Sequence, residues 1–386
     1  MKRILLLGGS GSIGSQSIQV IDKYKSNFDL VGISIGERTE KLDEIIKNHA
    51  NLKYITLKLE KDYNFFKQKY PEITFYYGDK GLIEIIKNSN SDMVINALIG
   101  FVGFLPSIET IKNNKTLLLA NKETLVAGGE IINSLLKEYK TKMYPIDSEH
   151  VAISKCLFNR NSDIKKIIIT ASGGPFFFLL KKDFIKIKPE DALKHPTWKM
   201  GNKITIDSAT MMNKCFEIIE AHELFHLDFD RIDVLVDRKS HVHSMVEYEN
   251  GDVFLQVGPS DMRIPIEYAL FEGKPIKGDK FDDVEVNTFN NYQFYKMDYE
   301  KFPLIKYAQD VIKQKGNLGA VLNAANEVCV NSFLSNKINY VDIKRIIDKI
   351  MKVYPYIKDI TISDILKTDK EVRELTQRII EEKDYD

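Results

Sequence analysis

Cysteine and long apolar runs are scarce in this sequence. Only three cysteines occur among 386 residues, at positions 156, 215 and 329, widely spaced and odd in number. They predict neither a disulfide framework nor a paired-cysteine metal site, and they favour a reducing cytoplasm. The longest apolar stretch after the N-terminus, residues 93–105, contains Asn96 and two glycines, so it is unsuited to crossing a bilayer.

Net charge of either sign is also missing. Lys plus Arg and Asp plus Glu both total 55, which argues against a strongly basic nucleic-acid binder. The apolar run 4–7 is too short for a signal peptide and ends in glycines. We therefore expect no membrane or targeting segment. The expected location is the cytoplasm, or a plastid-type organelle if a transit peptide was removed before residue 1.

The first third of the chain alternates short aliphatic runs with helical patterns. Strands are expected at 3–7, 30–35, 54–57, 93–97 and 116–120, and helices at 15–24, 41–48 and 81–88. Strands that alternate with helices imply βαβ units and a parallel sheet.

The rest of the chain has a different texture. A strand at 166–170 and hairpin-like strands around 249–252 indicate an α+β region, and helices are expected at 304–314, 320–334, 340–353 and 369–382. The predicted fold is α/β, with a Rossmann-like N-terminal domain (1–147), a central α+β catalytic domain (148–272), a linker (273–298) and a C-terminal helical bundle (299–386).

A glycine-rich loop, residues 9–14, follows the first strand and opens the first helix. Glycines there let the backbone approach a pyrophosphate, whose charge meets the free N–H groups of the helix N-terminus. The second strand ends at Gly36, Glu37 and Arg38. An acidic residue at this place binds the 2′-hydroxyl of NAD, whereas an arginine binds the 2′-phosphate of NADP, so the local signal is divided.

Two segments carry carboxylates in a pattern that suits a hard cation. Asp147 and Glu149 follow a predicted strand with Ser148 between them, and oxygen ligands favour Mg²⁺ or Mn²⁺ over zinc. An ordinary polar turn would have the same composition. The segment 207–221 reads as a helix start followed by a helix that places residues 213, 217 and 220 on one face. That face could be simply solvated, or it could bind a phosphate and complete a metal site.

Three further motifs have competing interpretations. Residues 170–175 form a glycine turn or an anion-binding nest. The loop 195–201, with the only tryptophan, is either a hydrophobic plug or a lid over a ligand. His222 and His226 match the H-E-x-x-H zinc-peptidase pattern, but the third histidine of the extended pattern is missing, and an ordinary amphipathic helix fits equally well.

Taken together, these segments resemble the 1-deoxy-D-xylulose 5-phosphate reductoisomerase family along nearly the whole chain. The motifs that carry the resemblance are 11–14, 119–123, 145–150, 172–176, 195–198, 207–217 and 322–327. Glu37 departs from the family, because this position is often basic in relatives.

The resemblance implies a homodimer that uses NADPH and Mg²⁺ or Mn²⁺. It implies metal binding by Asp147, Glu149 and Glu217, with Lys122 and His195 as further catalytic residues. It implies substrate contacts from Lys122, Ser148, Glu149, Ser172, His195, Trp198, Ser208, Asn213, Lys214 and Glu217. It implies cofactor contacts from Ser10, Gly11, Ser12, Ile13, Gly36, Glu37, Arg38, Asn121, Glu123, Met200 and Gly201.

The implied reaction breaks and remakes a C–C bond of 1-deoxyxylulose 5-phosphate and reduces the branched aldehyde to 2-C-methylerythritol 4-phosphate, an isoprenoid precursor. One alternative is another NADP-dependent dehydrogenase of a small phosphorylated substrate, which would need no divalent metal. A second alternative is a zinc peptidase built on His222 and His226.

Overall fold

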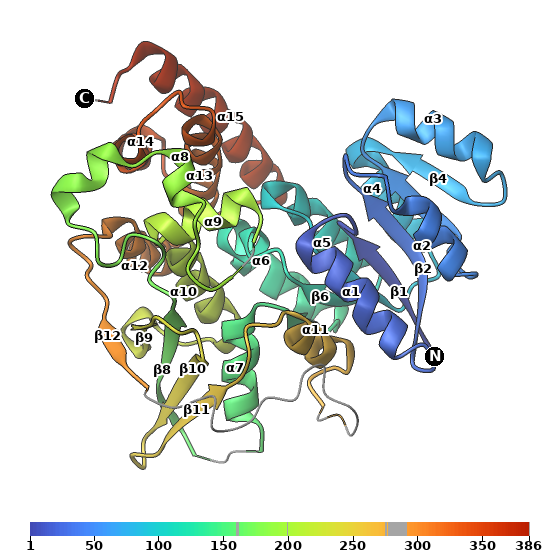
Figure 1. The fold of residues 1–386 in the computed structure, drawn as a ribbon, viewed down its shortest axis with the longest axis horizontal. Helices are drawn as coiled ribbons and strands as arrows, with labels where there is room; N and C mark the ends of the chain where they lie inside the picture. Colours follow the sequence, from blue (N-terminus) through green and yellow to red (C-terminus); the bar gives the residue numbers. More distant parts are fainter. Residues whose placement is uncertain (160–161, 199, 275, 277–291, 386) are drawn as a thin grey trace. The chain divides into compact units, whose positions relative to one another are not determined.

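The computed structural model describes residues 1–386 except 160–161, 199, 275, 277–291 and 386. The chain forms two compact units (Figure 1). Unit 1 comprises Met1–Thr124, Ile132–Val151 and the described residues of 261–281, and unit 2 comprises the remainder. Among the described residues, no helix combines the length and apolarity that a membrane crossing requires.

A parallel sheet forms the centre of unit 1. Within the described residues it has seven strands in the order β4-β3-β2-β1-β5-β6-β7. Their bounds are β1 (Lys2–Leu7), β2 (Phe28–Ile35), β3 (Tyr54–Leu57), β4 (Thr74–Tyr77), β5 (Met93–Asn96), β6 (Thr116–Leu119) and β7 (Met143–Pro145). The strand order reverses between β1 and β5, where open α/β sheets bind nucleotides.

Helices cover both faces of this sheet. They are α1 (Ser12–Lys23), α2 (Leu42–Asn48), α3 (Glu60–Lys69), α4 (Gly78–Asn88), α5 (Phe104–Lys112) and α11 (Arg263–Leu270). The helices α6 (Glu123–Tyr139) and α7 (Ser148–Leu157) are divided between the units, because residues 125–131 and 152–157 belong to unit 2. Side chains of β1 alternate between the faces, so Leu5 packs with Ile85 of α4 on one face. On the other face Leu6 packs with Ile21 of α1 and Ile266 of α11. Both faces are therefore buried, as parallel sheets require.

Unit 2 contains a second sheet of mixed direction. The described strands are ordered β11-β10-β8-β9-β12, and only β8 and β9 run parallel. Their bounds are β8 (Ile164–Ala171), β9 (Ile232–Asp237), β10 (Val242–Tyr248), β11 (Val253–Val257) and β12 (Phe294–Lys296). The predicted hairpin at 249–252 is the turn between β10 and β11.

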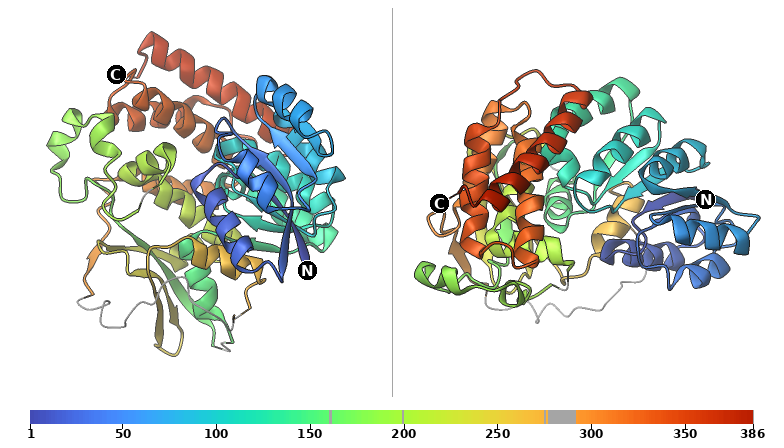
Figure 2. Two further views of the ribbon diagram at one scale, coloured as in Figure 1. Left: turned by 45° about the vertical axis from the view of Figure 1, so that its right-hand side comes forward. Right: turned by 90° about the horizontal axis from the view of Figure 1, so that it is seen from above.

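The helices of unit 2 pack around a common core with this sheet. They are α8 (Pro189–Ala192), α9 (Asn202–Thr210), α10 (Met212–Phe225), α12 (Tyr307–Gln314), α13 (Leu318–Leu334), α14 (Tyr340–Val353) and α15 (Ile362–Glu382). The last three lie side by side in the orange and red part of the chain (Figure 2). Asn339 with Asp342, and Thr361 with Asp364, form capping boxes that fix the starts of α14 and α15.

The predicted α/β class and the C-terminal helices are confirmed, but the compact units do not follow the predicted linear boundaries. Residues 263–270 return to unit 1, because Ile266, Ala269 and Leu270 complete its core. The predicted central and helical domains share one core, in which Ile167, Phe216 and Leu322 are members. Most of the predicted linker lies outside the described residues. The functional division of the chain into domains stays a prediction.

Candidate active site

The glycine loop of unit 1 has the geometry that a bound nucleotide needs. It joins β1 to α1 at the edge where the strand order reverses. Gly8 has φ +87°, and a Cβ on it would lie 2.5 Å from the carbonyl oxygen of Ala97, which follows β5. A Cβ on Gly14 would clash with the carbonyl oxygen of Gly8. Side chains are therefore excluded, and the N-terminus of α1 can be approached closely.

Ser10 connects this loop to the end of β2. Its hydroxyl accepts a hydrogen bond from the backbone N–H of Gly36 at 3.2 Å. Its carbonyl oxygen accepts a hydrogen bond from the guanidinium of Arg38. Glu37 turns away from Arg38 and pairs with Lys58, with 2.6 Å between the carboxylate and Nζ. The structure therefore places Arg38, and not Glu37, against the glycine loop.

Asn121 organises the turn after β6. Its amide donates to the carbonyl oxygens of Leu98 and Gly100, at 2.9 and 2.8 Å, and to Glu123 at 3.2 Å. The loop after β5 is thus held by a buried side chain at the start of α6. Asn121 therefore supports the loop at the carboxyl edge of the unit 1 sheet, and its contact with the cofactor stays a prediction.

Asp147 lies between β7 and α7 and is surrounded by cationic groups of unit 1. Its carboxylate is 2.6 Å from Nζ of the buried Lys122 and 3.7 Å from Nδ1 of the buried His150. Burial alone would raise the pKa of Asp147, but the charge of Lys122 and the hydrogen bond and charge of His150 hold it well below its usual range. Asp147 is therefore an anion at any pH of interest.

Ser148 and Glu149, which the sequence placed in a turn after a strand, form the first turn of the helix α7. The hydroxyl of Ser148 donates to the Glu149 carboxylate, and the Glu149 N–H points to Asp147 at 3.4 Å. A helix forms because the backbone N–H of Val151 donates to the Asp147 carbonyl oxygen at 3.0 Å. Carboxylates at the start of a helix are stabilised by its dipole.

His195 joins two serines of unit 2 that are distant in the sequence. Its Nε2 lies 3.0 Å from Oγ of Ser172, after β8, and 3.1 Å from Oγ of Ser208, on α9. Its Nδ1 accepts the backbone N–H groups of Thr197 and Trp198, at 3.3 and 2.9 Å. Burial, and then the charge of Arg238, lower the pKa of His195 to about 4. The imidazole is thus neutral, and because Nδ1 accepts, the proton is on Nε2.

The face of α10 carries the predicted polar residues. The amide of Asn213 donates to the Glu217 carboxylate one helical turn later. Lys214 donates to the same carboxylate and, at 2.6 Å, to the carbonyl oxygen of Thr170 at the end of β8. Lys214 and Glu217 are both buried. The predicted face at residues 213 and 217 is confirmed, whereas the predicted helix start at Asp207 is wrong.

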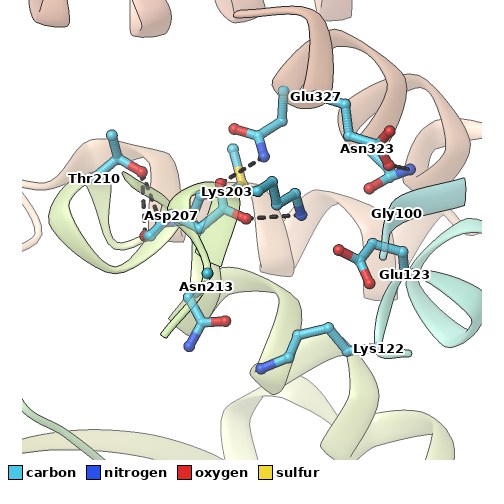
Figure 3. A network of polar contacts seen from close by, with 12 residues as sticks. Gly100, Lys122, Glu123, Lys203, Asp207, Thr210, Asn213, Asn323 and Glu327 are labelled. Atoms are coloured by element: carbon cyan, nitrogen blue, oxygen red, sulfur yellow. Dashed lines mark hydrogen bonds and ion pairs between the residues drawn. The ribbon is translucent and has the colours of Figure 1, made fainter. Parts of the chain in front are cut away.

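Asp207 lies in the last turn of α9, and the chain then breaks at Met211, with φ +64°, before α10 begins. Its carboxylate accepts from Lys203 at 2.7 Å and from Asn326 of α13 at 2.8 Å (Figure 3). Sequence reasoning missed both partners. Lys203 lies four residues before Asp207, a spacing that could have indicated the pair once a helix was assigned there, whereas Asn326 is 119 positions away and gives no local signal.

Arg238 is a residue to which the sequence assigned no role. It follows β9, and its guanidinium donates to the carbonyl oxygens of Ser172 and Gly174, at 2.5 and 2.6 Å. Both glycines of this turn have positive φ, and a Cβ on Gly174 would lie 2.7 Å from the Ser208 carbonyl oxygen. The turn of residues 172–174 is therefore fixed against the end of α9.

The alternative of a zinc peptidase built on His222 and His226 finds no support in the described part of the chain. Nδ1 of His222 contacts the Leu227 carbonyl oxygen at 2.7 Å, and His226 is the left-handed cap that ends α10. Neither histidine belongs to a cluster of potential metal ligands in the described part of the chain. Trp198 is half-buried, with its ring centroid 6.2 Å from that of His243. Met200 and Gly201 directly precede α9.

The strand order and the bare glycine loop of unit 1 define the class of Rossmann-type, nucleotide-dependent oxidoreductases. Family profiles match residues 4–129 as 1-deoxy-D-xylulose 5-phosphate reductoisomerase, and residues 143–225 and 257–375 as its C-terminal domains. The chain belongs to the 1-deoxy-D-xylulose 5-phosphate reductoisomerase family.

Individual relatives match over almost the full length. The reductoisomerase of Thermoanaerobacter pseudethanolicus is 42% identical over 97% of this chain and 98% of its own. That of Chloroherpeton thalassium is 43% identical over 97% of both chains. A crystal structure of DOX-P reductoisomerase with NADPH, fosmidomycin and magnesium superposes with a TM-score of 0.92 at 32% identity, covering 99% of this chain and 98% of that one. The Zymomonas mobilis enzyme with NADPH gives 0.89 at 33%, covering 98% and 99%.

Proposed function

We propose that this protein converts 1-deoxy-D-xylulose 5-phosphate into 2-C-methyl-D-erythritol 4-phosphate with NADPH and a divalent metal ion. The observation that carries the proposal is the similarity to reductoisomerases over 97% of the chain. The glycine loop and the polar clusters of both units fall within the matched segments.

The cofactor is assigned to the carboxyl edge of the unit 1 sheet. The bare backbone at Gly11 and the N-terminus of α1 suit the pyrophosphate, and Arg38 suits a 2′-phosphate. Asn121 supports the neighbouring loop. The remaining residues of the proposed cofactor site are Ser10, Ser12, Ile13, Gly36, Glu37, Glu123, Met200 and Gly201.

The substrate phosphate is assigned to the polar cluster of unit 2. The neutral His195 offers its Nε2–H between the hydroxyls of Ser172 and Ser208, and Lys214 and Arg238 supply positive charge nearby. Hydrogen-bond donors around a cationic centre suit a phosphate dianion. Asn213 completes the set, and Trp198, in the loop next to His195, is proposed to cover the ligand.

Asp147, Glu149 and Glu217 are the proposed metal ligands. Their carboxylate oxygens fit Mg²⁺ or Mn²⁺, and the lowered pKa of Asp147 keeps one donor deprotonated. Such an ion, when bound, polarises the oxygens of an adjacent ketone and hydroxyl. Lys122 holds Asp147 in place, and Ser148 orients the Glu149 carboxylate. Lys122, Ser148 and Glu149 are also proposed to contact the substrate.

The test is NADPH oxidation, followed by absorbance, with 1-deoxyxylulose 5-phosphate as the only substrate. We expect turnover with Mg²⁺ or Mn²⁺ and none in excess chelator, together with formation of the methylerythritol phosphate. Turnover that is indifferent to chelator would favour the alternative of a metal-independent dehydrogenase. Absence of substrate-dependent oxidation under all conditions would contradict the proposal.

We further infer a homodimer in the cytoplasm. Support for a dimer comes from β11, an edge strand in the described sheet, on which Val253 and Leu255 are 51% and 43% exposed. Exposed apolar edge strands favour pairing with another chain. Support for the location comes from Cys156, Cys215 and Cys329, which are all free thiols.

A further inference from the structure

Lys58 lies beside the segment where an NADP 2′-phosphate would bind. The strands β2 and β3 run parallel, with Ile35 opposite Leu57, so the residues after them meet at the carboxyl edge of the sheet. The backbone N–H of Lys58 donates to the Ile35 carbonyl oxygen at 3.2 Å. Lys58 is therefore anchored next to Gly36, Glu37 and Arg38 by the sheet itself.

The side chain of Lys58 is paired with Glu37 across a solvent-exposed contact. Nζ lies 2.6 Å from the carboxylate, and the two side chains are 59% and 64% exposed. The hydrogen bond and charge of Lys58 lower the pKa of Glu37, which keeps the carboxylate ionised. Exposed pairs of this kind contribute little free energy, so a dianion can displace the carboxylate at small cost.

The three side chains at this place differ in what they favour. A carboxylate at the end of β2 suits the ribose 2′-hydroxyl of NAD and repels a phosphate. Arg38 favours a phosphate, but one of its N–H groups is already directed to the Ser10 carbonyl oxygen. Lys58 neutralises Glu37, and Arg38 forms no ion pair among the described residues, so the segment is attractive to an anion.

We infer that Lys58 is a further specificity-determining residue for NADPH, and that the 2′-phosphate takes the place of the Glu37 carboxylate as the partner of its ammonium group. The inference rests on the proposed use of NADPH. It explains how a chain with Glu37 at the end of β2 retains a phosphate site, because Lys58, at the end of the neighbouring strand β3, offsets this carboxylate.

The experiment compares dissociation constants for NADPH and NADH in the wild type and in Lys58→Ala. We expect NADPH to bind about 10-fold more weakly in the variant, as for the loss of one charge-assisted contact, and NADH to change less than about 2-fold. The matched control is Lys53→Ala, which removes an exposed lysine just before the other end of β3. Adenosine 2′,5′-bisphosphate and adenosine 5′-monophosphate serve as probes that differ only in the 2′-phosphate.

A third variant tests the exchange of anions. Glu37→Gln removes the competing carboxylate, so this variant should bind NADPH at least as tightly as the wild type does. The NADPH affinity of Lys58→Ala should fall less steeply with salt than that of the wild type or of Glu37→Gln. If Glu37→Gln weakened the binding of NADPH and not that of NADH, the proposed exchange of the Glu37 carboxylate for the 2′-phosphate would be overturned.

Suppose that the wild type prefers NADPH and turns over 1-deoxyxylulose 5-phosphate. If Lys58→Ala then keeps the ratio of NADPH to NADH affinity, or loses both affinities equally, the inference about Lys58 is overturned and the proposed function is not. A wild type with neither property would overturn the proposed function as well. Loss of the whole preference in Arg38→Ala, with none lost in Lys58→Ala, would assign the phosphate to Arg38 only.

Discussion

Individual side chains in the candidate site are held in one ionisation state by their neighbours. Lys122 and His150 keep Asp147 anionic, and burial keeps His195 neutral. The residue types were predictable from the motifs. Their states were not, because they depend on tertiary structure: the pKa of His195 is set by burial and then by the charge of Arg238, a residue of another segment.

Because the pKa of His195 is lowered in the folded protein, we predict that the free energy of unfolding depends on pH. An unfolded histidine binds a proton near pH 6.5, whereas the folded one does so near pH 4, so the unfolded state binds more protons between these values. This contribution to the free energy of unfolding is present above pH 6.5 and is lost as pH falls towards 4.

Urea unfolding of wild type and His195→Gln at several pH values checks this. The variant should lose less stability over this range than the wild type. A slope will remain, because burial also lowers the pKa of His49 and His243. Identical pH dependence in both proteins would show that His195 titrates alike in both states.

Glu217→Gln should abolish most turnover. Loss of one charged group from an active site costs on the order of 100-fold in rate, and here it would also leave the buried Lys214 without its anion. NADPH affinity should be preserved, because most of the proposed cofactor site lies in unit 1, and circular dichroism reports on the fold of the variant. Glu374→Gln, on the exposed part of α15, removes the same charge as a control. Full turnover of Glu217→Gln would refute the metal assignment.

At the scale of elements, periodicity predicted the strands at 54–57 and 116–119 and the helix at 340–353 closely. It missed β4 and α3, because α3 buries only Phe66 and β4 is a short, partly exposed strand. It also missed the break between α9 and α10, where no glycine or proline marks Met211. Met211 is left-handed there, and the contact of the nearby Asp207 with Asn326 of α13 depends on the fold of unit 2.

Gly174→Ala should disturb the junction between the turn of residues 172–174 and α9. The residue has φ +63°, and its new Cβ would meet the Ser208 carbonyl oxygen at 2.7 Å. Strain and overlap together should cost about 2–4 kcal/mol and raise KM for the substrate. Gly251→Ala, with φ +89° and open space around it, carries the strain alone and should cost about 1–2 kcal/mol. Urea unfolding and KM measurements compare the two variants. Equal losses of stability in Gly174→Ala and Gly251→Ala would show that the contact with the Ser208 carbonyl oxygen adds nothing to the backbone strain.

The loop with Trp198 should close over a ligand. Trp198 is the only tryptophan, so emission excited at long wavelength reports on this loop alone. It is half-buried near His243, and His195 beside it holds the two backbone N–H groups that shape the loop. Fosmidomycin with metal should shift the emission to the blue and reduce acrylamide quenching, since closure excludes water.

Trp198→Ala should then weaken substrate binding or turnover and leave NADPH affinity much less affected. Emission that is already blue and quencher-resistant in the free protein, and that fosmidomycin does not move, would identify Trp198 as part of the core and refute the lid.

At the scale of the whole molecule, the sequence predicted the α/β class because alternation of strands and helices is a local signal. It did not predict that α11 completes the core of unit 1, since Ile266 joins the same buried cluster as Leu6 from a distant part of the sequence. Membership of a core is a property of tertiary packing, so linear boundaries drawn from composition miss segments that return. Association between chains is likewise a matter of packing that local sequence patterns do not predict. Substitutions on the exposed strand β11 test it.

We predict that the wild type sediments at twice the 44.4 kDa of one chain, and that Leu255→Lys sediments as a single chain. Leu255 is exposed beside Val253 on the edge strand, and a lysine there would have to be desolvated when a second copy pairs with β11. Val353→Lys, at the end of α14 and 51% exposed, places the same charge on another apolar site and should remain dimeric. Circular dichroism confirms that both variants fold. A dimeric Leu255→Lys would exclude β11 as the interface, and a monomeric wild type would contradict the homodimer itself.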